Sequence, residues 1–587
     1  MKSNTQTQPH WKLVLRVIPY IFNYQIVTKA ALTVWIILLG KIFQALLKSS
    51  GRVAVTSGDY KFLFTTWQGI AILLLGLVTL FIYIAIDLNS KIALSRNLLN
   101  GEKASLGTCL KEGFLSIGKL INLRGLIVVI YIALIAPVLG IGVSVTLTEG
   151  LHIPTFITAF IESSVLYSAL AGAAVLLFLS VGIANLFILH GIVLDGMTVA
   201  EAGKQSGDLI RANWKDYLKQ NILFILLIVV LLAGVLLIFL ALPLKLIGML
   251  PLSGPVSRLL TVFFVTGGVL ISVLADLLGT PLYLLKMTQL YYSYRQGTDF
   301  EWHGREPENH TAGKVVMILA VAAVFAAVFL MNANFDRLFP AGTDVKIIAH
   351  RGGGSEAAEN TLAGLEAACR TGAYGSEIDI QRTADGHYII NHDGTFKRVA
   401  GEKRKPQEMT LQEIRKLSVD GEPVAAFEEM LEAGHGRIVL FTELKGKTAD
   451  RKMAEDAVRL VRQYHMEEEC VLISLDYGLI DYIETTYPEM QTGFLTFASF
   501  GRTADLNCDY IGLEEESATK DAIRSIHQEG KKVLVWTVNK KGSQKYFLCT
   551  RADAIITDYV SRAAAIASEL EERSDLERMI DTIKTVI

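Results

Sequence analysis

Residue types suited to phosphoester chemistry follow several apolar runs in residues 344–587. Glu377 and Asp379 stand two apart in the run SEIDI, and Glu443 and Lys445 stand two apart after IVLFT. Residues two apart on a strand point to the same face of a sheet, so each pair would present its polar groups together. Carboxylates are hard oxygen ligands, which suit Mg²⁺ or Ca²⁺ better than zinc. The pattern therefore favours a site for one divalent cation, Mg²⁺ or Ca²⁺.

Two histidines and an arginine occur in the same pattern. His350 and Arg351 follow the run VKIIA, and His392 follows YIIN. Histidine can act as acid or base near neutral pH, and the arginine fork matches a phosphate. Each motif alone is common at turns and on solvated strands. Their combination with a cation that polarises a phosphoryl oxygen suits phosphodiester cleavage.

Apolar runs and helical patterns alternate through this part of the chain, which predicts a parallel sheet. The run 388–391 follows 376–380 too closely for a helical crossover, and Asp385-Gly386 between them predicts a hairpin turn. A two-residue turn would place Asp379 opposite His392. The remaining eight strands predict an α/β (β/α)₈ TIM barrel, whose active site lies at the carboxyl ends of the strands. The predicted strands are 345–349, 376–380, 388–391, 438–443, 471–475, 491–496, 509–513, 533–538 and 554–557.

Residues 1–333 differ from the rest by their long apolar runs, which account for a mean hydropathy of +0.39 and a hydrophobic content of 51%. A membrane-spanning helix needs about 20 apolar residues. The sequence predicts an α-helical membrane domain with about seven spans: 28–47, 63–87, 125–147, 162–190, 221–243, 259–285 and 313–333. We therefore divide the chain into a multi-pass domain (1–333), a linker (334–343) and a barrel domain (344–587).

Lys and Arg are more frequent before the first span and after the second, fourth and sixth. This bias predicts a cytoplasmic N-terminus, and seven spans then place the C-terminal domain outside the cell membrane. One span more or fewer would reverse that result. Three acids lie within or near spans: Glu162, Asp87 and Asp276. They indicate either a lipid or ion pathway, or a helix end or satisfied polar contact.

Bulk properties exclude several classes of function. The formal net charge of -2 and a pI near 6.6 argue against nucleic acid as a partner. The five cysteines form no C-x-x-C pair, so neither a zinc site nor a thioredoxin-type motif is expected. The expected partners are the lipid bilayer and a small substrate, and a homo-oligomer stays open.

The motifs together carry a resemblance to a known family. They are HRG (350–352), ENT (359–361), EIDIQRTADGHYIINHD (377–393), ELK (443–445), WTVN (536–539) and TD (557–558). The soluble part resembles the glycerophosphodiester phosphodiesterases nearly end to end. The membrane part looks like the multi-pass extension of one bacterial subgroup.

The resemblance implies a barrel of the PLC-like phosphodiesterase type that hydrolyses glycerophosphodiesters to sn-glycerol 3-phosphate and an alcohol. The family mechanism is thought to use a neighbouring glycerol hydroxyl as nucleophile, through a cyclic phosphate. By position, the resemblance implies three sets of roles. They are metal ligands Glu377, Asp379 and Glu443; acid and base His350 and His392; and substrate contacts Arg351, Lys445 and Trp536.

Three readings of function remain open on the sequence. The first is a membrane-anchored hydrolase acting on head-group diesters or on a lipid-linked glycerophosphate. The second is a glycerophospho-lyase or transferase acting on a lipid-linked substrate. The third is a lipid-binding membrane protein with a relic barrel, which the presence of all five metal-binding and histidine side chains disfavours.

Overall fold

The computed structural model describes residues 10–52, 54–56, 61–102, 105–138, 161, 164–298, 300, 311–497 and 499–586. The chain forms two compact units. The first comprises residues 1–42, 71–151 and 158–334, and the second comprises 43–70, 152–157 and 335–587. Each unit is described by itself.

Long apolar helices build the first unit. In the described residues, five segments are long and apolar enough to cross a membrane: Val17–Ser49, Trp67–Leu99, Val165–Leu194, Val199–Met249 and Gly254–Gln296. They match the predicted spans one, two, four, five and six. Predicted span three corresponds in part to α5 (Leu123–Val138), and its residues 139–147 lie outside the described part. Predicted span seven corresponds to α12 (Thr311–Ala333).

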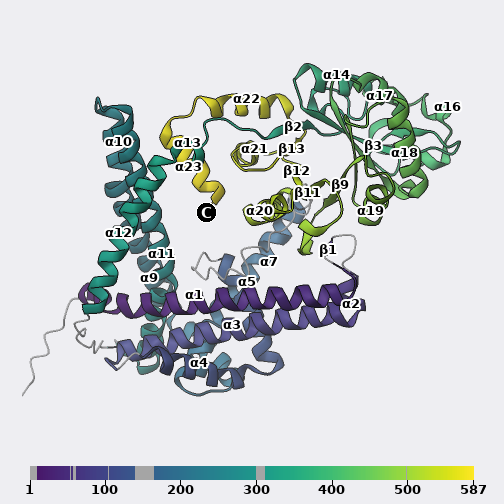
Figure 1. Cartoon of the computed structure of the whole chain (residues 1–587). Coiled ribbons are helices and arrows are strands. Elements are labelled where there is room, and N and C mark those ends of the chain that lie inside the picture. The colour runs from purple at the N-terminus through teal and green to yellow at the C-terminus, as the bar shows by residue number, and fades with distance from the viewer. Residues whose placement is uncertain are drawn as a thin grey trace, which may run out of the picture. The chain divides into compact units, whose positions relative to one another are not determined.

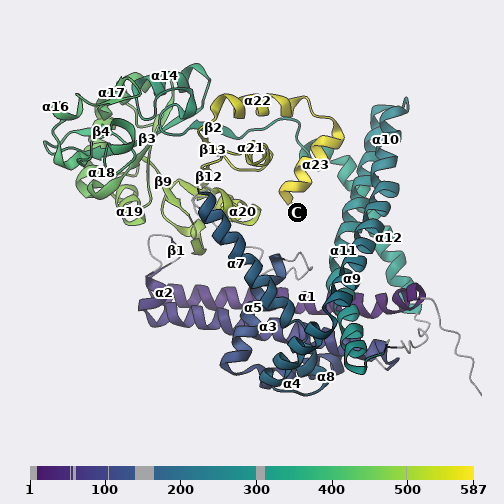
Figure 2. The ribbon, with the colours of Figure 1, turned by 180° about the vertical axis from the view of Figure 1, so that it is seen from behind.

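The helical segments that match predicted spans one, five and six extend past them at both ends, and those that match spans two and four extend past them only at the C-terminal end. The helix α11 (Gly254–Gln296) has 43 residues, about 65 Å at 1.5 Å per residue, against a hydrocarbon thickness of about 30 Å. It lies beside α9 (Val199–Leu236) and α12 in both ribbon views (Figures 1 and 2). A capping box of Thr198 and Glu201 begins α9, and Gly297 at a φ of 69° ends α11.

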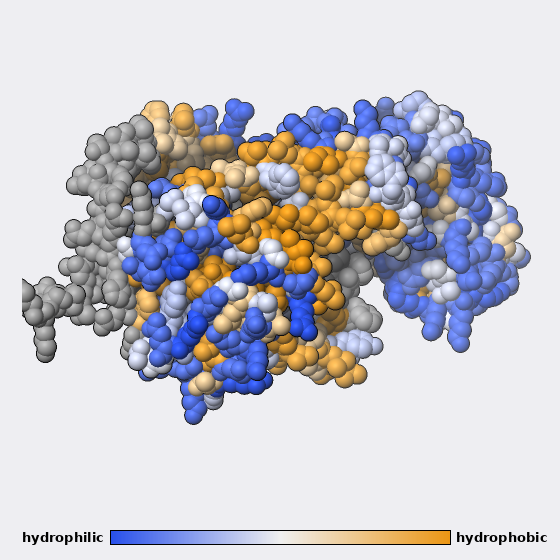
Figure 3. All heavy atoms as spheres, turned by 90° about the horizontal axis from the view of Figure 1, so that it is seen from below, coloured by the Kyte–Doolittle hydropathy of each residue, from blue (hydrophilic) through white to orange (hydrophobic). Residues whose placement is uncertain are grey.

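Apolar side chains remain on the surface of these helices. Leu223, Leu227 and Leu231 of α9 are each more than half exposed, and large hydrophobic patches cover the N-terminal helices on the face drawn in Figure 3. A soluble domain would bury such residues, whereas a bilayer solvates them. The first unit is therefore a membrane domain.

A closed barrel of eight parallel strands forms the core of the second unit. The strand order is β2-β13-β12-β11-β9-β8-β7-β3, and β2 also pairs with β3, which closes the ring. The strands are β2 (Lys346–Ala349), β3 (Gly375–Arg382), β7 (Val439–Leu444), β8 (Cys470–Ser474), β9 (Gln491–Thr496), β11 (Tyr510–Glu514), β12 (Lys532–Trp536) and β13 (Ala554–Thr557). The predicted barrel and its eight parallel strands are confirmed.

Helices cover the outside of the barrel. They are α14 (Leu362–Arg370), α17 (Phe427–Gly434), α18 (Arg451–Gln463), α19 (Tyr477–Thr486), α20 (Lys520–Gln528), α21 (Lys541–Leu548) and α22 (Val560–Glu571). Thr361, Asp450, Asp476 and Thr519 cap four of them through side-chain oxygens. The barrel interior is filled by apolar side chains such as Ile348, Phe441 and Leu534, so the polar site is confined to the rim.

The strand β4 (Tyr388–Ile390) returns antiparallel along β3, as the hairpin prediction required, but with a different register. Ile380 pairs with Ile390, and the backbone N–H of Asn391 donates to the carbonyl of Asp379. The predicted opposition of Asp379 and His392 is therefore wrong by one residue. The turn holds three residues, 384–386, instead of two, and Gly386 at a φ of 88° supplies the left-handed residue that such a loop needs.

The predicted linker is a packed part of the second unit. It contains the short helix α13 (Phe335–Leu338), whose Phe335 is buried. The helix α23 (Asp575–Val586) holds it through Arg578, which pairs with Asp336 at 2.7 Å and donates to the carbonyl of Phe339 at 2.7 Å. Arg573, just before α23, donates to the carbonyls of Pro340 and Ala341.

Candidate active site

Three buried carboxylates form the centre of the rim. Glu377 and Asp379 of β3 and Glu443 of β7 each offer an oxygen within 4.8 Å of the others. Strand pairing explains the cluster, because Asp379 is the direct neighbour of Glu443 in the β3–β7 register. One cation, Lys445, lies 2.9 Å from Asp379 and 2.8 Å from Glu443. Three acids facing one lysine leave an excess of negative charge that suits a divalent cation.

The crowding shifts the pKa values of these acids in opposite directions. Burial and the two neighbouring carboxylates hold the pKa of Glu377 well above its ordinary value. Burial also raises the pKa of Glu443 to about 7, although Lys445 opposes the shift. Burial alone would raise the pKa of Asp379, but Lys445 and His392 lower it to about 2. A divalent cation would remove the cost of ionising all three acids.

His350 is oriented from the neighbouring strand β13. Its Nδ1 lies 2.6 Å from Oδ1 of Asp558, and Oδ2 of Asp558 accepts a hydrogen bond from Asn539 at 2.6 Å. His350 and Asn539 lower the pKa of Asp558, against a rise from burial. The ionised carboxylate fixes the proton on Nδ1, so Nε2 is free to face the cluster, where it lies 4.0 Å from Oε2 of Glu377.

His392 is oriented in the same way but by its own chain neighbour. Its Nδ1 lies 2.8 Å from Asp393, and Arg398 donates to the other oxygen of Asp393 at 2.8 Å. The chain leaves β4 at Asn391, where Gln381 binds the carbonyls of Asn391 and Asp393. This turn brings His392 to the cluster despite the shifted register. Burial lowers the pKa of His392, so the ring is neutral at pH 7.

Arg351 occupies a strained position in the loop after β2. Its φ is 51°, in the left-handed region, and its backbone N–H donates to Glu377 at 2.7 Å. Two glycines allow the loop to pack this closely, because a Cβ at Gly353 would meet the backbone of Gly364 at 2.5 Å and one at Gly354 would meet Asp558 at 2.4 Å. The Nε of Arg351 is buried and has no hydrogen-bond partner among the described residues.

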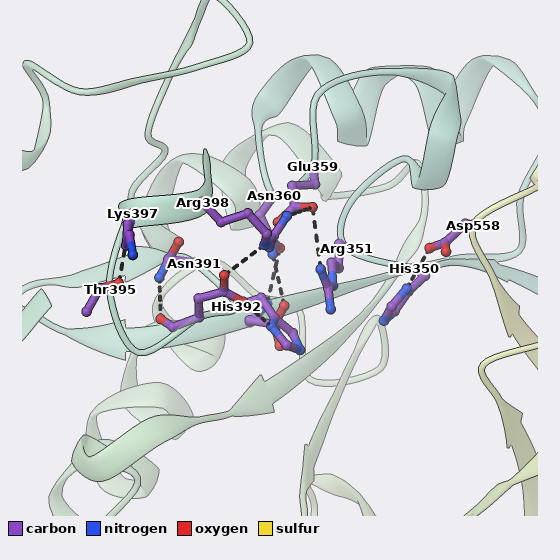
Figure 4. A network of polar contacts seen from close by, with 12 residues as sticks. His350, Arg351, Glu359, Asn360, Asn391, His392, Thr395, Lys397, Arg398 and Asp558 are labelled. Carbon is purple, nitrogen blue, oxygen red and sulfur yellow. Dashed lines mark hydrogen bonds and ion pairs between the residues drawn. The ribbon is translucent and has the colours of Figure 1, made fainter. Parts of the chain in front are cut away.

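The polar side chains around Arg351 form one network, drawn in Figure 4. Glu359 accepts from Arg351 at 3.4 Å and from two nitrogens of Arg398. Asn360, also at a positive φ, donates to Asp379 at 2.9 Å. These contacts connect the loop that holds Arg351 to the turn that holds His392, and Asn360 joins them to the carboxylate of Asp379.

Trp536 ends β12 at the same rim. Its indole lies over Gly512 of β11, where a Cβ would meet the ring at 3.5 Å, and its edge contacts Phe497 with a centroid distance of 4.9 Å. The indole Nε1 is buried without a hydrogen-bond partner in the described part of the chain. Like the Nε of Arg351, it is a hydrogen-bond donor without a partner among the described residues, and it suits an oxygen-rich ligand.

The structure brings the predicted residues to one rim. Glu377 and Asp379 lie within β3, and Glu443 and Trp536 lie in the last two residues of β7 and β12. The others follow β2, β4 and β7: His350, Arg351, His392 and Lys445. Sequence reasoning gave no role in the site to Asn360, Asp393, Arg398 and Asp558. The TD pair and the NHD motif contain two of them, but only the fold shows that each aspartate holds a histidine.

Comparisons with known proteins agree with this geometry. Residues 350–562 match the model of the glycerophosphoryl diester phosphodiesterase family, and residues 12–330 match the membrane domain of glycerophosphoryl diester phosphodiesterase. A glycerophosphodiester phosphodiesterase of Caldanaerobacter subterraneus is 26% identical over 231 residues, covering 36% of this chain and 93% of the relative. One of Bacillus altitudinis is 24% identical, covering 38% and 99%.

Among solved structures, a phosphodiesterase of Oleispira antarctica in complex with the product sn-glycerol-3-phosphate is similar to the barrel. It is 22% identical, with a TM-score of 0.36, and the match covers 38% of this chain and 96% of that one. A glycerophosphodiester phosphodiesterase of Parabacteroides distasonis is 24% identical, with a TM-score of 0.36 and coverage of 39% and 98%.

Proposed function

The chain belongs to the glycerophosphoryl diester phosphodiesterase family, and we propose that it is a metal-dependent hydrolase that releases sn-glycerol 3-phosphate from glycerophosphodiesters at a membrane. The observation that carries the proposal is the set of three buried carboxylates with one lysine, flanked by two histidines that aspartates orient. A binding protein would have no need for two oriented histidines beside a metal site.

Glu377, Asp379 and Glu443 would hold the cation. Their ligand atoms lie within 4.8 Å of one another and are all oxygens, which suits Mg²⁺ or Ca²⁺. When bound, such an ion polarises a phosphoryl oxygen and stabilises the charge that develops on it. Lys445 partly balances the acids and can contact the same phosphate.

The two histidines would act as acid and base. Each has its Nδ1 engaged by an aspartate, which leaves Nε2 to take or give a proton. One ring removes the proton from the attacking hydroxyl, either of water or of the glycerol, and the other protonates the leaving alcohol. Arg351 binds the phosphate through its free Nε, and Trp536 contacts the glycerol.

The membrane domain would anchor the barrel, with the N-terminus in the cytoplasm and the barrel outside the cell. Residues 1–333, 334–343 and 344–587 would be the membrane domain, linker and catalytic domain. Labelling of single cysteines in intact cells tests the orientation: Ala384→Cys, on an exposed turn of the barrel, should react with an impermeant maleimide. Reaction only after lysis would place the barrel inside.

Release of glycerol 3-phosphate from glycerophosphoglycerol by the purified protein tests the activity. We expect release that EDTA abolishes and that Mg²⁺ or Ca²⁺ restores, and that His350→Ala and His392→Ala each lack. A cyclic phosphate as the final product would identify a lyase. No cleavage with any divalent cation, on this or on lipid-linked glycerophosphate, would contradict an enzymatic role.

A further inference from the structure

A short strand from outside the barrel sequence pairs with the barrel rim. The strand β1 (Ala54–Thr56) lies between the first two long helices, α1 (His10–Ser49) and α3 (Trp67–Leu99). It pairs antiparallel with β10 (Ser499–Gly501), with Ala54 opposite Gly501 and Thr56 opposite Ser499. The compact unit that contains the barrel accordingly includes residues 43–70. Figure 1 shows β1 beneath β9.

Apolar burial holds this two-stranded sheet in place. Ala54 and Val55 are 6% and 4% exposed, and Ala54 belongs to the same core cluster as Phe494 and Ala504 of the barrel. Isolated pairs of three-residue strands are not stable in water, so burial must supply the stability. Further along the loop, Phe62 is buried and the guanidinium of Arg52 lies 4.9 Å from its ring centroid.

The partner strand β10 begins where the active-site rim ends. Phe497 stands between β9 and β10, and its ring meets Trp536 edge to face. The carbonyl of Phe497 accepts a hydrogen bond from Ser517 at 2.5 Å. Phe497 is thus fixed on one side by Ser517 and on the other by the strand that β1 pairs with.

We propose that β1 is a wall of the catalytic mouth, and that it positions Phe497 against Trp536 as a second aromatic contact for the glycerol end of the substrate. Phe497 is then a specificity-determining residue, and Val55 and Ala54 are positioning residues that act through β10. The inference rests on the proposed function for the identity of the substrate. It also requires the loop after α1 to lie on the same side of the membrane as the barrel.

Cross-linking in the full-length protein tests the strand pairing. Directly opposite residues of antiparallel strands have Cα atoms about 4.5–5.5 Å apart, within the range of a disulfide. Under mild oxidation, Ala54→Cys with Gly501→Cys should yield a linked peptide pair by mass spectrometry. Ala54→Cys with Ala384→Cys, on the β3–β4 turn, serves as the control and should yield none. An absent Ala54–Gly501 link would overturn the proposal.

Kinetics test the positioning role. Phe497→Ala and Val55→Asp should each raise KM for glycerophosphoglycerol about tenfold, the effect expected when an aromatic contact is lost, while kcat changes less than about threefold. Val55→Ile, which keeps an apolar side chain, should leave KM unchanged, and so should Thr65→Asp, at an exposed position of the short helix α2 (Phe62–Thr65).

The outcomes separate the two proposals. A raised KM in Phe497→Ala beside an unchanged KM in Val55→Asp would overturn the role of β1. A link in the double variant Ala54→Cys with Gly501→Cys, beside a wild-type protein without any diesterase activity, would overturn the proposed function and leave the strand pairing intact. An unchanged melting temperature in Val55→Asp excludes general unfolding as the cause of a raised KM.

Discussion

The two units balance the charge of acidic side chains in different ways. In the membrane domain, Asp87 pairs with Lys91 of the same helix at 2.6 Å, with both side chains 7% exposed, and Asp276 pairs with Lys29 at 3.3 Å. Each of these two acids forms an ion pair with a lysine. In the barrel, three acids share one lysine: Lys445 pairs with Asp379 and Glu443, and Glu377 lies beside them. A balanced pair is complete as folded, whereas the unbalanced cluster needs a further positive charge.

Removing the cation should have the largest effect. EDTA, or Asp379→Asn in the presence of metal, should lower kcat/KM for glycerophosphoglycerol by more than about 10,000-fold, because the uncompensated cluster neither binds the phosphate nor stabilises its charge. Isothermal titration should show loss of metal binding in Asp379→Asn. Full activity in EDTA would show that Lys445 balances the three acids well enough for catalysis. The difference in charge balance between the two units would then not reflect a need for a metal.

Substitution of the two histidines should have the second-largest effect on activity. His350→Ala and His392→Ala should each lower kcat about 100- to 10,000-fold, the usual contribution of general acid or base catalysis, with metal affinity retained. Because neither ring is a predicted metal ligand, a titration that shows weaker metal binding in either variant would place that histidine in the metal site instead.

Asp558→Asn should lower kcat about 10- to 100-fold, the effect of losing a group that orients a catalytic side chain. The amide cannot fix the proton on Nδ1 of His350, so the pH profile of kcat should shift as well. Asp558→Glu should recover part of the activity. An identical pH profile in Asp558→Asn would limit Asp558 to a structural role.

The apo barrel should lose stability as pH rises. The pKa of Glu443 is about 7 in the folded state against 4.5 ordinarily, so between these values the folded state keeps a proton that the unfolded chain has released. In EDTA, the free energy of unfolding should therefore fall by about 3 kcal/mol from pH 4.5 to 7. Saturating Mg²⁺ or Ca²⁺ should reverse the slope, because ligands must ionise to bind metal.

Urea unfolding at several pH values measures this slope. Glu443→Gln should reduce it in EDTA, since the amide does not titrate. A slope that stays the same in Glu443→Gln would assign the titration to another group.

The smallest effect is expected in the membrane domain. Replacing both partners of the balanced pair, Asp87→Asn with Lys91→Met, should leave kcat/KM within about twofold, because residues that pair with each other and share no partner with a second site do not couple to it. A large loss of activity in this charge-neutral variant would show that the membrane domain takes part in catalysis.

Local patterns predicted the barrel and its acids well, because strand alternation and the two-residue spacing of Glu377 and Asp379 depend on sequence neighbours alone. The hairpin register was missed by one residue, since Asp385-Gly386 occurs in three-residue turns as well as in two-residue ones. The contact of His350 with Asp558 depends on closure of the ring between β13 and β2. The pairing of β1 with β10 joins residues more than 400 positions apart, and no local sequence pattern predicts it.

The membrane spans show a similar division. Composition located the apolar cores of the helices, but a helix such as α3 continues past its predicted span, where polar residues such as Asn89 and Lys91 are buried in protein. Hydropathy reflects the solvent that surrounds a helix. It therefore underestimates the length of a helix wherever protein, instead of lipid, packs around it.

The clamp of Arg573 and Arg578 on residues 336–341 has a mechanical consequence. A linker of ten unstructured residues could extend about 33 Å, and the barrel could then move over that distance. Because α12 ends at Ala333 and α13 begins at Phe335, Asn334 alone connects these two helices along the chain. A joint of one residue leaves little slack in the chain between the end of α12 and the start of α13.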